Sequence, residues 1–246
     1  MSEQNSSGRS LLVADLHLSE ERPEATGRFF HFLDHTAKGA DALYILGDLF
    51  EYWIGDDDTH NSLAMQLAEK LKSLSAKGTS VFFMHGNRDF LLAKGYAGQS
   101  GMTLLADPMI INLHGTPTLL SHGDLFCTDD TRYQQYRKWI RRPAIQKMLL
   151  MLPLEFRRAL AGSARMKSER EKAGKPLEIM DVNPDAVIRA YREYGVTRLI
   201  HGHTHRPALH ESTDSGKKLE RWVLPDWFDC GGYLVCTSAG CQLEVA

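Results

Sequence analysis

Five short polar motifs carry carboxylate, amide and imidazole side chains, and each follows a short apolar run. In chain order they are Asp15-Leu16-His17, Gly47-Asp48, Gly86-Asn87-Arg88-Asp89, His122-Gly123-Asp124 and His201-Gly202-His203-Thr204-His205. Nitrogen and oxygen ligands without a thiolate favour Mn²⁺, Fe²⁺ or Zn²⁺. Because their number suits a pair of divalent ions, the motifs predict a two-metal site that hydrolyses phosphate esters.

Seven side chains in these motifs are the candidate metal ligands: Asp15, His17, Asp48, Asn87, His122, His203 and His205. In an extended segment residues i and i+2 point the same way, so we expect Asp15 and His17 to hold one ion together. Asp48 offers two oxygens and is expected to bridge both ions. His203 and His205 have the same spacing, and we expect one to serve each ion if the turn splays them.

The apolar runs before the motifs are short and end in Gly, Asp or His. They predict buried strands at 10–14, 43–46, 81–84, 118–120 and 198–200. Apolar residues at turn spacing predict helices at 23–37 and 61–74. Asn183 and Pro184 predict the cap and first position of another helix, which Gly195 would end.

The order of these elements predicts an α/β fold. Strands alternate with helices up to Pro207, after which a period-two pattern with turns at 214–216 and 239–240 predicts a second sheet of hairpins. We therefore expect an α/β sandwich of two sheets flanked by helices. In open α/β sheets ligands gather where strands end, which is where the five motifs lie.

The segment from about 127 to 180 interrupts this order and is predicted to be a helical insertion that caps the domain. Aromatic and aliphatic residues alternate there with Lys and Arg at helical spacing. Between Thr131 and Lys175 there are 13 basic and three acidic residues, a net charge of +10 within a chain whose net charge is −2. Such a block suggests an anionic partner, either a phosphorylated ligand, a lipid headgroup surface or nucleic acid.

The length of 246 residues suits one large domain with an inserted cap, expected over 10–246 after a disordered polar tail at 1–9. No apolar run approaches the roughly 20 residues that span a bilayer, and the first residues lack the apolar region of a secretory signal. We therefore expect a cytosolic protein. In that setting the four cysteines, none in a C-x-x-C pair, are expected to be core thiols rather than disulfides or zinc ligands.

The order of the five motifs resembles the calcineurin-like metallophosphoesterase superfamily, over the chain from Leu11 to Pro207. That resemblance implies a sandwich of two mixed β-sheets flanked by helices. It also implies that a metal-activated water attacks phosphorus in line, with cations stabilising the transition state. The phosphatases of this superfamily have Gly-Asn-His-Glu where this chain has Gly86-Asn87-Arg88-Asp89. Because Arg88 cannot act as an acid, it is expected to stabilise charge on a phosphate oxygen.

Longer strings around the motifs narrow the resemblance. Gly47 to Asp57, Gly86 to Leu91, His122 to Tyr133 and Ile200 to Pro207 look like the UDP-2,3-diacylglucosamine diphosphatases. The resemblance implies attack on the α-phosphorus of UDP-2,3-diacylglucosamine, giving UMP and 2,3-diacylglucosamine 1-phosphate in lipid A biosynthesis. Such a substrate would need an apolar cleft for its acyl chains and cations for its phosphates, and the insertion combines both.

The resemblance also implies which residues act. Asn87 and Arg88 are the expected catalytic residues. The expected substrate contacts are Asn87, Arg88, Asp130, Tyr133, Arg165, Ser168, Lys172, Lys175 and His203. The cofactor is expected to be two divalent ions, with Mn²⁺ first. We further expect a monomer that binds no nucleic acid and lies on the anionic cytoplasmic face of the bacterial inner membrane.

Two other hypotheses stay open on the residues alone. The first is a generalist metal-dependent phosphodiesterase that acts on soluble nucleotides and does not need Lys172 or Lys175. The second is a non-catalytic scaffold that retains the fold for binding. Scaffolds of this kind usually lose ligands, whereas all seven candidate ligands are present here, so the enzyme hypotheses are favoured.

Overall fold

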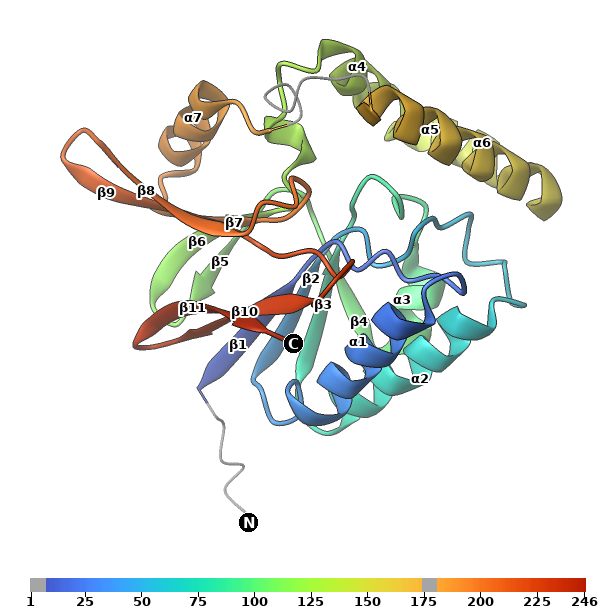
Figure 1. The fold of residues 1–246 in the computed structure, drawn as a ribbon, viewed down its shortest axis with the longest axis horizontal. Coiled ribbons are helices and arrows are strands. Elements are labelled where there is room, and N and C mark those ends of the chain that lie inside the picture. Colours follow the sequence, from blue (N-terminus) through green and yellow to red (C-terminus); the bar gives the residue numbers. More distant parts are fainter. Residues whose placement is uncertain (1–7, 174–180) are drawn as a thin grey trace.

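The computed structural model describes residues 8–173 and 181–246, with side chains described for 8–166 and 181–246. Two mixed sheets face each other with helices outside them (Figure 1). The six-stranded sheet has the order β11 (Gly240–Val245), β10 (Gly232–Thr237), β1 (Arg9–Val13), β2 (Ala42–Leu46), β3 (Ser80–Met84) and β4 (Met102–Leu105). The five-stranded sheet has the order β5 (Met109–Leu113), β6 (Thr116–Ser121), β7 (Arg198–His201), β9 (Lys217–Val223) and β8 (Ala208–Asp214).

Alternate residues of each strand face different layers of the core, as the two-residue period of a strand requires. Leu11 and Val13 pack toward α1 (Pro23–His35), α2 (Ser62–Ala76) and α3 (Lys94–Ser100). Leu12 instead joins the cluster between the two sheets, together with Ile200 and Trp222. The outer face of the five-stranded sheet packs on α7 (Pro184–Tyr194). The predicted sandwich of two sheets flanked by helices is confirmed.

The predicted strands and helices are confirmed, with ends that shift by one or two residues. The caps predicted for α7 are also present. The Asn183 side chain accepts a hydrogen bond from the backbone N–H of Ala186 at 3.0 Å. Gly195 ends the helix with φ of +64°, a left-handed conformation that glycine adopts without a steric cost.

The prediction that the C-terminal hairpins form the second sheet was wrong. Hairpin β8–β9 pairs with β7, but hairpin β10–β11 pairs antiparallel with β1 in the other sheet. β6 and β7, which we expected beside β1 to β3, belong to the five-stranded sheet. A period of two identifies a strand, but it carries no information about which distant strand becomes its neighbour. The short elements α3, β4 and β5 were missed altogether.

Two further expectations need correction. Cys236 and Cys241 form a disulfide, because the β10–β11 register places them directly opposite each other. Of the other two cysteines, Cys127 is buried as expected and Cys230 is exposed. Arg9, which we placed in the tail, is the first residue of β1, and the rest of that expected tail up to residue 7 lies outside the described residues.

Among the described residues between β6 and α7, a short 3-10 turn (Asp124–Phe126) is followed by three α-helices: α4 (Thr131–Ile140), α5 (Pro143–Leu150) and α6 (Leu154–Ala173). They lie beside the loops that follow β2 and β3 (Figure 1). Within residues 8–173 and 181–246, no helix combines the length and apolarity needed to cross a bilayer. The division into a tail, a domain and a cap stays a prediction.

Much of the positive charge of these helices meets acidic side chains of the sandwich. Among the residues whose side chains are described, five arginines make such ion pairs: Arg137 and Arg141 each with Asp107 and Asp124, Arg157 with Asp57, Arg158 with Asp58, and Arg165 with Glu21 and Glu51. The basic block predicted an external anionic partner. In the structure a large part of it docks the helices on the acidic sandwich of the same chain.

We predict that Asn183→Ala lowers the free energy of unfolding by about 1 kcal/mol, because it removes the acceptor that caps α7. Urea denaturation followed by circular dichroism measures this change. Asn183→Ser is the matched control, since serine also caps helices and should restore most of the loss. Equal stability of the alanine and wild-type proteins would contradict the prediction.

Candidate metal centre

Backbone hydrogen bonds hold the motif loops together where the strands end. The N–H of Asp15 donates to the carbonyl of Gly47 at 3.1 Å, and that of His17 donates to the carbonyl of Asp48 at 2.9 Å. At the ends of the neighbouring strands β6 and β7 of the five-stranded sheet, the N–H of Gly202 donates to the carbonyl of His122 at 2.9 Å. Four of the five motifs are therefore joined in pairs before any side chain is considered.

The candidate ligands lie in an unusual backbone conformation. Five of the seven are left-handed: Asp15 (φ +54°), His17 (+47°), Asp48 (+52°), His203 (+71°) and His205 (+54°). Such residues cost of order 1 kcal/mol each, and Asp and His are among the non-glycine residues that adopt this conformation most often. The expected extended geometry was therefore wrong. Sharp turns, and not an extended strand end, bring the i and i+2 side chains together.

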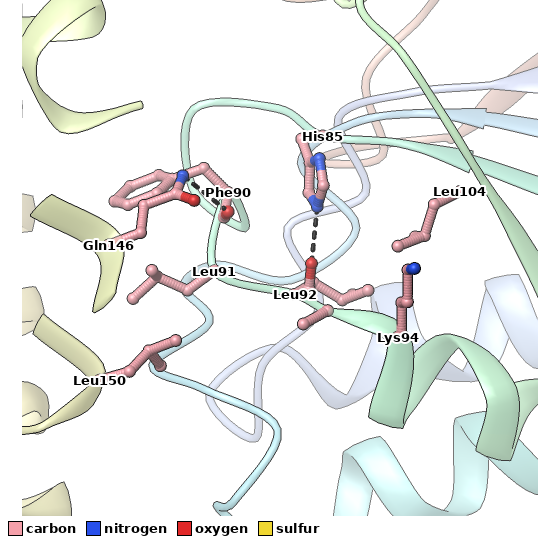
Figure 2. A pocket seen from close by; sticks show the side chains of 9 residues that line it. His85, Phe90, Leu91, Leu92, Lys94, Leu104, Gln146 and Leu150 are labelled. Atoms are coloured by element: carbon pink, nitrogen blue, oxygen red, sulfur yellow. Dashed lines mark hydrogen bonds between the residues drawn. The ribbon is translucent and has the colours of Figure 1, made fainter. Parts of the chain in front are cut away.

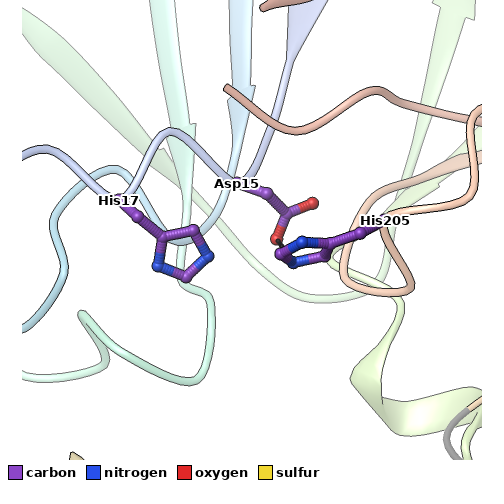
Figure 3. A group of neighbouring side chains, drawn as sticks. All are labelled: Asp15, His17 and His205. Atoms are coloured by element: carbon purple, nitrogen blue, oxygen red, sulfur yellow. Dashed lines mark ion pairs between the residues drawn. The ribbon is translucent and has the colours of Figure 1, made fainter. Parts of the chain in front are cut away.

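The first group of candidate ligands consists of Asp15, His17 and His205, which lie close enough to hold one ion (Figure 3). His205 Nε2 lies 3.6 Å from Asp15 Oδ1. His17 Nε2 lies 3.6 Å from Asp48 Oδ2, on the side of the second group. Asp15 and His17 thus come together as expected, and His205 joins them.

The second group consists of Asp15, Asp48 and His122. Asp48 directs Oδ2 toward His17 and Oδ1 toward His122, at 3.9 Å from its Nε2, as a bridging carboxylate would. Asn87 Oδ1 lies 3.2 Å from the same nitrogen. The His203 ring lies 5.0 Å from the His122 ring, between centroids. All seven candidate ligands are therefore gathered at one place, with His203 and His205 on different sides of it.

The observations favour cations in this cluster. Asp15 and His122 are fully buried, and His17 is 4% exposed. Asp15 Oδ1 and His17 Nε2 are buried and form no hydrogen bond within the described part of the chain. Because buried polar atoms nearly always have a partner, these atoms fit ligands of a bound ion.

The electrostatics agree with this interpretation. Burial raises the pKa of Asp15, and the neighbouring charge of Asp48 raises it further. Burial by itself would lower the pKa of His122, but the carboxylates of Asp48, Asp124 and Asp15 outweigh it and raise the value to about 9. At His122 these carboxylates therefore produce a negative potential, which a divalent cation would relieve.

Asp89 and Arg88 lie next to the cluster with different functions. Asp89 is fully buried and accepts the backbone N–H groups of Gly86 at 2.8 Å and Leu49 at 2.7 Å, so it joins two motif loops. Burial and the charge of Asp48 raise its pKa to about 6. The Arg88 backbone donates to Asp48 Oδ1 at 2.9 Å, and its buried Nε has no hydrogen-bond partner among the described residues.

A family model described as calcineurin-like phosphoesterase matches residues 8–207. This chain belongs to the calcineurin-like phosphoesterase family. The family predicted from the five motifs is thereby confirmed. Membership fits the cluster, since carboxylate, amide and imidazole ligands around two ions are what a phosphoesterase of this kind needs.

Relatives named UDP-2,3-diacylglucosamine hydrolase resemble this phosphoesterase along nearly its whole length. Those of Aeromonas salmonicida (strain A449) and Cellvibrio japonicus (strain Ueda107) are each 48% identical over 235 residues. Both matches cover 96% of this chain. They cover 92% of the Aeromonas salmonicida protein and 98% of the Cellvibrio japonicus protein. That of Enterobacter sp. (strain 638) is 47% identical over 234 residues, covering 95% of this chain and 97% of the relative. The phosphoesterase belongs to one family with these proteins.

The residues expected to contact substrate occupy varied positions in this phosphoesterase. The Tyr133 ring stacks 6.1 Å from the His203 ring, and its hydroxyl donates to Asp124 at 2.6 Å. Asp130 caps α4 by accepting the Tyr133 N–H at 3.1 Å. Arg165 Nε lies 3.2 Å from Glu51 Oε1. The helix α6 includes Ser168 and Lys172, but their side chains, and Lys175 altogether, lie outside the described residues.

Sequence reasoning missed several residues that surround the candidate ligands. Glu51 lies 3.5 Å from His17 Nδ1, and Asp226 lies 3.3 Å from His205 Nδ1. Phe228 stacks on both imidazoles, with 5.2 Å between centroids in each case. Glu51 could have been found, because it follows Asp48 by three residues within a motif string. Asp226 and Phe228 lie in a loop without a comparable signal.

We predict that Gly86→Ala weakens metal binding about tenfold or more, because a Cβ at this position would overlap the Asp48 carboxylate. Titration of the chelated apoprotein with Mn²⁺ measures the change. Gly98→Ala in α3 is the matched control, since nothing lies within 4 Å of its Cβ position, and it should bind Mn²⁺ like the wild type. Unchanged affinity in a folded Gly86→Ala protein would contradict the prediction.

Proposed function

We propose that this protein hydrolyses the pyrophosphate bond of UDP-2,3-diacylglucosamine and releases UMP and 2,3-diacylglucosamine 1-phosphate in lipid A biosynthesis. The observation that carries this proposal is the 47–48% identity to relatives named UDP-2,3-diacylglucosamine hydrolase. Because the aligned regions cover 95–96% of the chain, they leave too few residues out to omit either the ligand cluster or helices α4 to α6.

The proposed chemistry assigns separate tasks to the residues of the cluster. Asp15, His17, Asp48, Asn87, His122, His203 and His205 would hold two divalent ions, for which we propose Mn²⁺. Bound ions of this kind supply Lewis acidity and make water a better nucleophile at neutral pH. Arg88 would hold a phosphate oxygen and stabilise the charge that develops there, helped by Asn87 and His203. The buried Nε of Arg88, which has no hydrogen-bond partner among the described residues, supports this assignment.

An apolar cavity against the loop that carries Asn87 and Arg88 supports a lipid substrate (Figure 2). It has a volume of about 240 Å³ and lies between the loop after β3 and helix α5. Leu91, Leu92 and Leu104 line it from the sandwich, and Leu150 lines it from α5. We propose that acyl chains of the substrate contact this surface. A substrate made only of nucleotide would have no use for such a lining.

The sugar-phosphate half of the substrate is assigned to the cap and its junction with the sandwich. Ser168, Lys172 and Lys175 would contact it from the region of α6, and Asp130, Tyr133 and Arg165 from nearer the cluster. This assignment rests on the family's motif spacing. We further propose that the protein acts as a monomer.

We predict that the purified protein with Mn²⁺ releases UMP from UDP-2,3-diacylglucosamine, and that in H₂¹⁸O the label enters UMP because attack occurs at the α-phosphorus. Chromatography and mass spectrometry of the products measure both. Failure to release UMP with Mn²⁺, Fe²⁺ and Zn²⁺ in turn would refute the proposed activity. Label found in the sugar phosphate would refute the position of attack alone.

The same assay separates the proposal from a generalist phosphodiesterase. Lys172→Ala combined with Lys175→Ala should lower turnover of the lipid substrate about tenfold or more, since charge-assisted hydrogen bonds contribute roughly 1.5–3 kcal/mol each. Turnover of a small diester such as bis(p-nitrophenyl) phosphate should not change. The generalist hypothesis is favoured instead if the lipid substrate is turned over no better than the soluble diester.

We propose that helices α4 to α6 also place the protein on the anionic cytoplasmic face of the bacterial inner membrane. Several large apolar side chains are exposed on them, among them Trp139 (48%), Met148 (63%) and Met151 (77%). Exposed Arg142 and Lys147 lie on the same segment, and each basic residue near an anionic surface can contribute about 1 kcal/mol. Apolar and basic side chains together are what an interfacial contact requires.

We predict that the protein co-sediments with vesicles containing phosphatidylglycerol, and that binding falls as the salt concentration rises. Arg142→Gln with Lys147→Gln should weaken this binding about 30-fold, as expected for two basic residues of about 1 kcal/mol each. Lys217→Gln with Lys218→Gln, in the distant β8–β9 hairpin, is the charge-matched control. Binding that is the same for neutral and anionic vesicles would contradict the proposal.

A further inference from the structure

We propose that Glu51 and Asp226 are positioning residues for one of the two ions, the one that Asp15, His17 and His205 would share. Each carboxylate would hold the Nδ1 of one histidine, so that both rings present Nε2 to the same ion. The inference rests on the two-ion centre of the proposed function and goes beyond its ligands. It concerns what turns two of those ligands toward their ion.

Both histidines have a carboxylate oxygen near Nδ1, although the buried Nδ1 of His17 forms no hydrogen bond among the described residues, and its contact with Glu51 is an ion pair. His17 Nδ1 lies 3.5 Å from Glu51 Oε2, and His205 Nδ1 lies 3.3 Å from Asp226 Oδ2. On the opposite side of each ring, Nε2 lies 3.6 Å from a carboxylate of the cluster. An ionised carboxylate only accepts hydrogen bonds, so it favours the histidine tautomer with the proton on Nδ1. In that tautomer Nε2 carries no proton and can donate its lone pair to a metal.

Asp226 reaches His205 because the residue after it is anchored in the core. Trp227 is fully buried, packs edge-on against Phe29 with 5.2 Å between centroids, and donates its backbone N–H to the carbonyl of Asp15 at 3.2 Å. The residues on either side of this anchor, Asp226 and Phe228, therefore both reach the histidines. The Phe228 ring lies nearly parallel to His17, at 15°, and limits rotation of the imidazoles.

Glu51 is held by an ion pair with helix α6, and not by an anchor in the core. It is 5% exposed, and its second oxygen lies 3.2 Å from Nε of Arg165 on α6. The two positioning carboxylates thus come from separate parts of the fold. Glu51 follows β2 and forms an ion pair with Arg165 of α6, and Asp226 lies in the loop between β9 and β10.

The other side of the cluster is arranged differently. His122 donates Nδ1–H to the backbone carbonyl of Leu46 at 2.9 Å, and no carboxylate is needed to fix its tautomer. Removing the negative charge of Glu51 or Asp226 should therefore affect one ion more than the other. Substitution of such outer partners of metal-bound histidines typically weakens affinity by about 10–100-fold.

The test measures the two Mn²⁺ dissociation constants of the full chain for Glu51→Gln and Asp226→Asn by calorimetry. Electron paramagnetic resonance at two equivalents of Mn²⁺ then shows whether the ions are paired. We expect one dissociation constant to rise about 10–100-fold while the other changes less than about threefold. The spectrum should change from that of a coupled pair to that of an isolated ion plus free Mn²⁺.

Glu211→Gln and Asp214→Asn are the matched controls, because these carboxylates lie on the β8–β9 hairpin and make ion pairs there, with Lys218 and with Arg192 of α7. They should bind two ions like the wild type. The proposal is overturned if both constants stay unchanged in the folded variants, or if both rise equally. If Glu51→Gln fails to fold, as judged by circular dichroism in EDTA, Asp226→Asn decides the question. A wild-type protein that binds fewer than two ions would refute the proposed two-ion centre itself.

Discussion

Two buried carboxylates, Asp15 and Asp48, face the same small space, and their negative charge must be balanced for the loops around them to keep their form. Burial removes the water that would otherwise solvate them and keeps the pKa of Asp15 raised. At Asp48 the burial is outweighed by His122, His17 and Arg88, which lower the pKa of that carboxyl. The left-handed turns that bring the surrounding ligands together cost further free energy. Folding therefore brings together residues that could hold cations, and the buried charge and the left-handed turns make this part of the structure less stable.

The sequence predicted this centre better than it predicted the sheets, for a physical reason. Ligand identity is a property of single residues, and a motif keeps its chemistry wherever the chain carries it. Strand partners are settled by contacts between distant segments, so hairpin β10–β11 was assigned to the wrong sheet although both of its strands were recognised. Asp226 and Phe228 escaped notice for the same reason, since only the burial of Trp227 in a distant part of the core brings them to the histidines.

The basic residues in and around helices α4 to α6 have two roles: some form ion pairs with the sandwich, and others can face an anionic ligand. Arg137 of α4 and Arg141, the residue after α4, converge on the buried Asp124, which directly follows the His122-Gly123 turn. Arg157 and Arg165 fasten α6 to the segment that follows Asp48. Pairs of this kind are costly to desolvate and add little net stability, but breaking one leaves a buried charge without compensation. They set the distance between the helices and the cluster, and the basic residues that remain can face an anionic ligand.

The position of β1 has a consequence for the synthesis of the chain. This strand lies between β2 and β10, and its residues Leu11 and Leu12 pair with Val235 and Leu234. During translation its second neighbour, β10, emerges only after more than two hundred further residues, so one edge of β1 stays open until β10 has been made. Asp15 and His17 extend from that strand. Asp226, which lies near His205, also belongs to the segment just before β10, so the centre can acquire its final form only after this late segment has emerged.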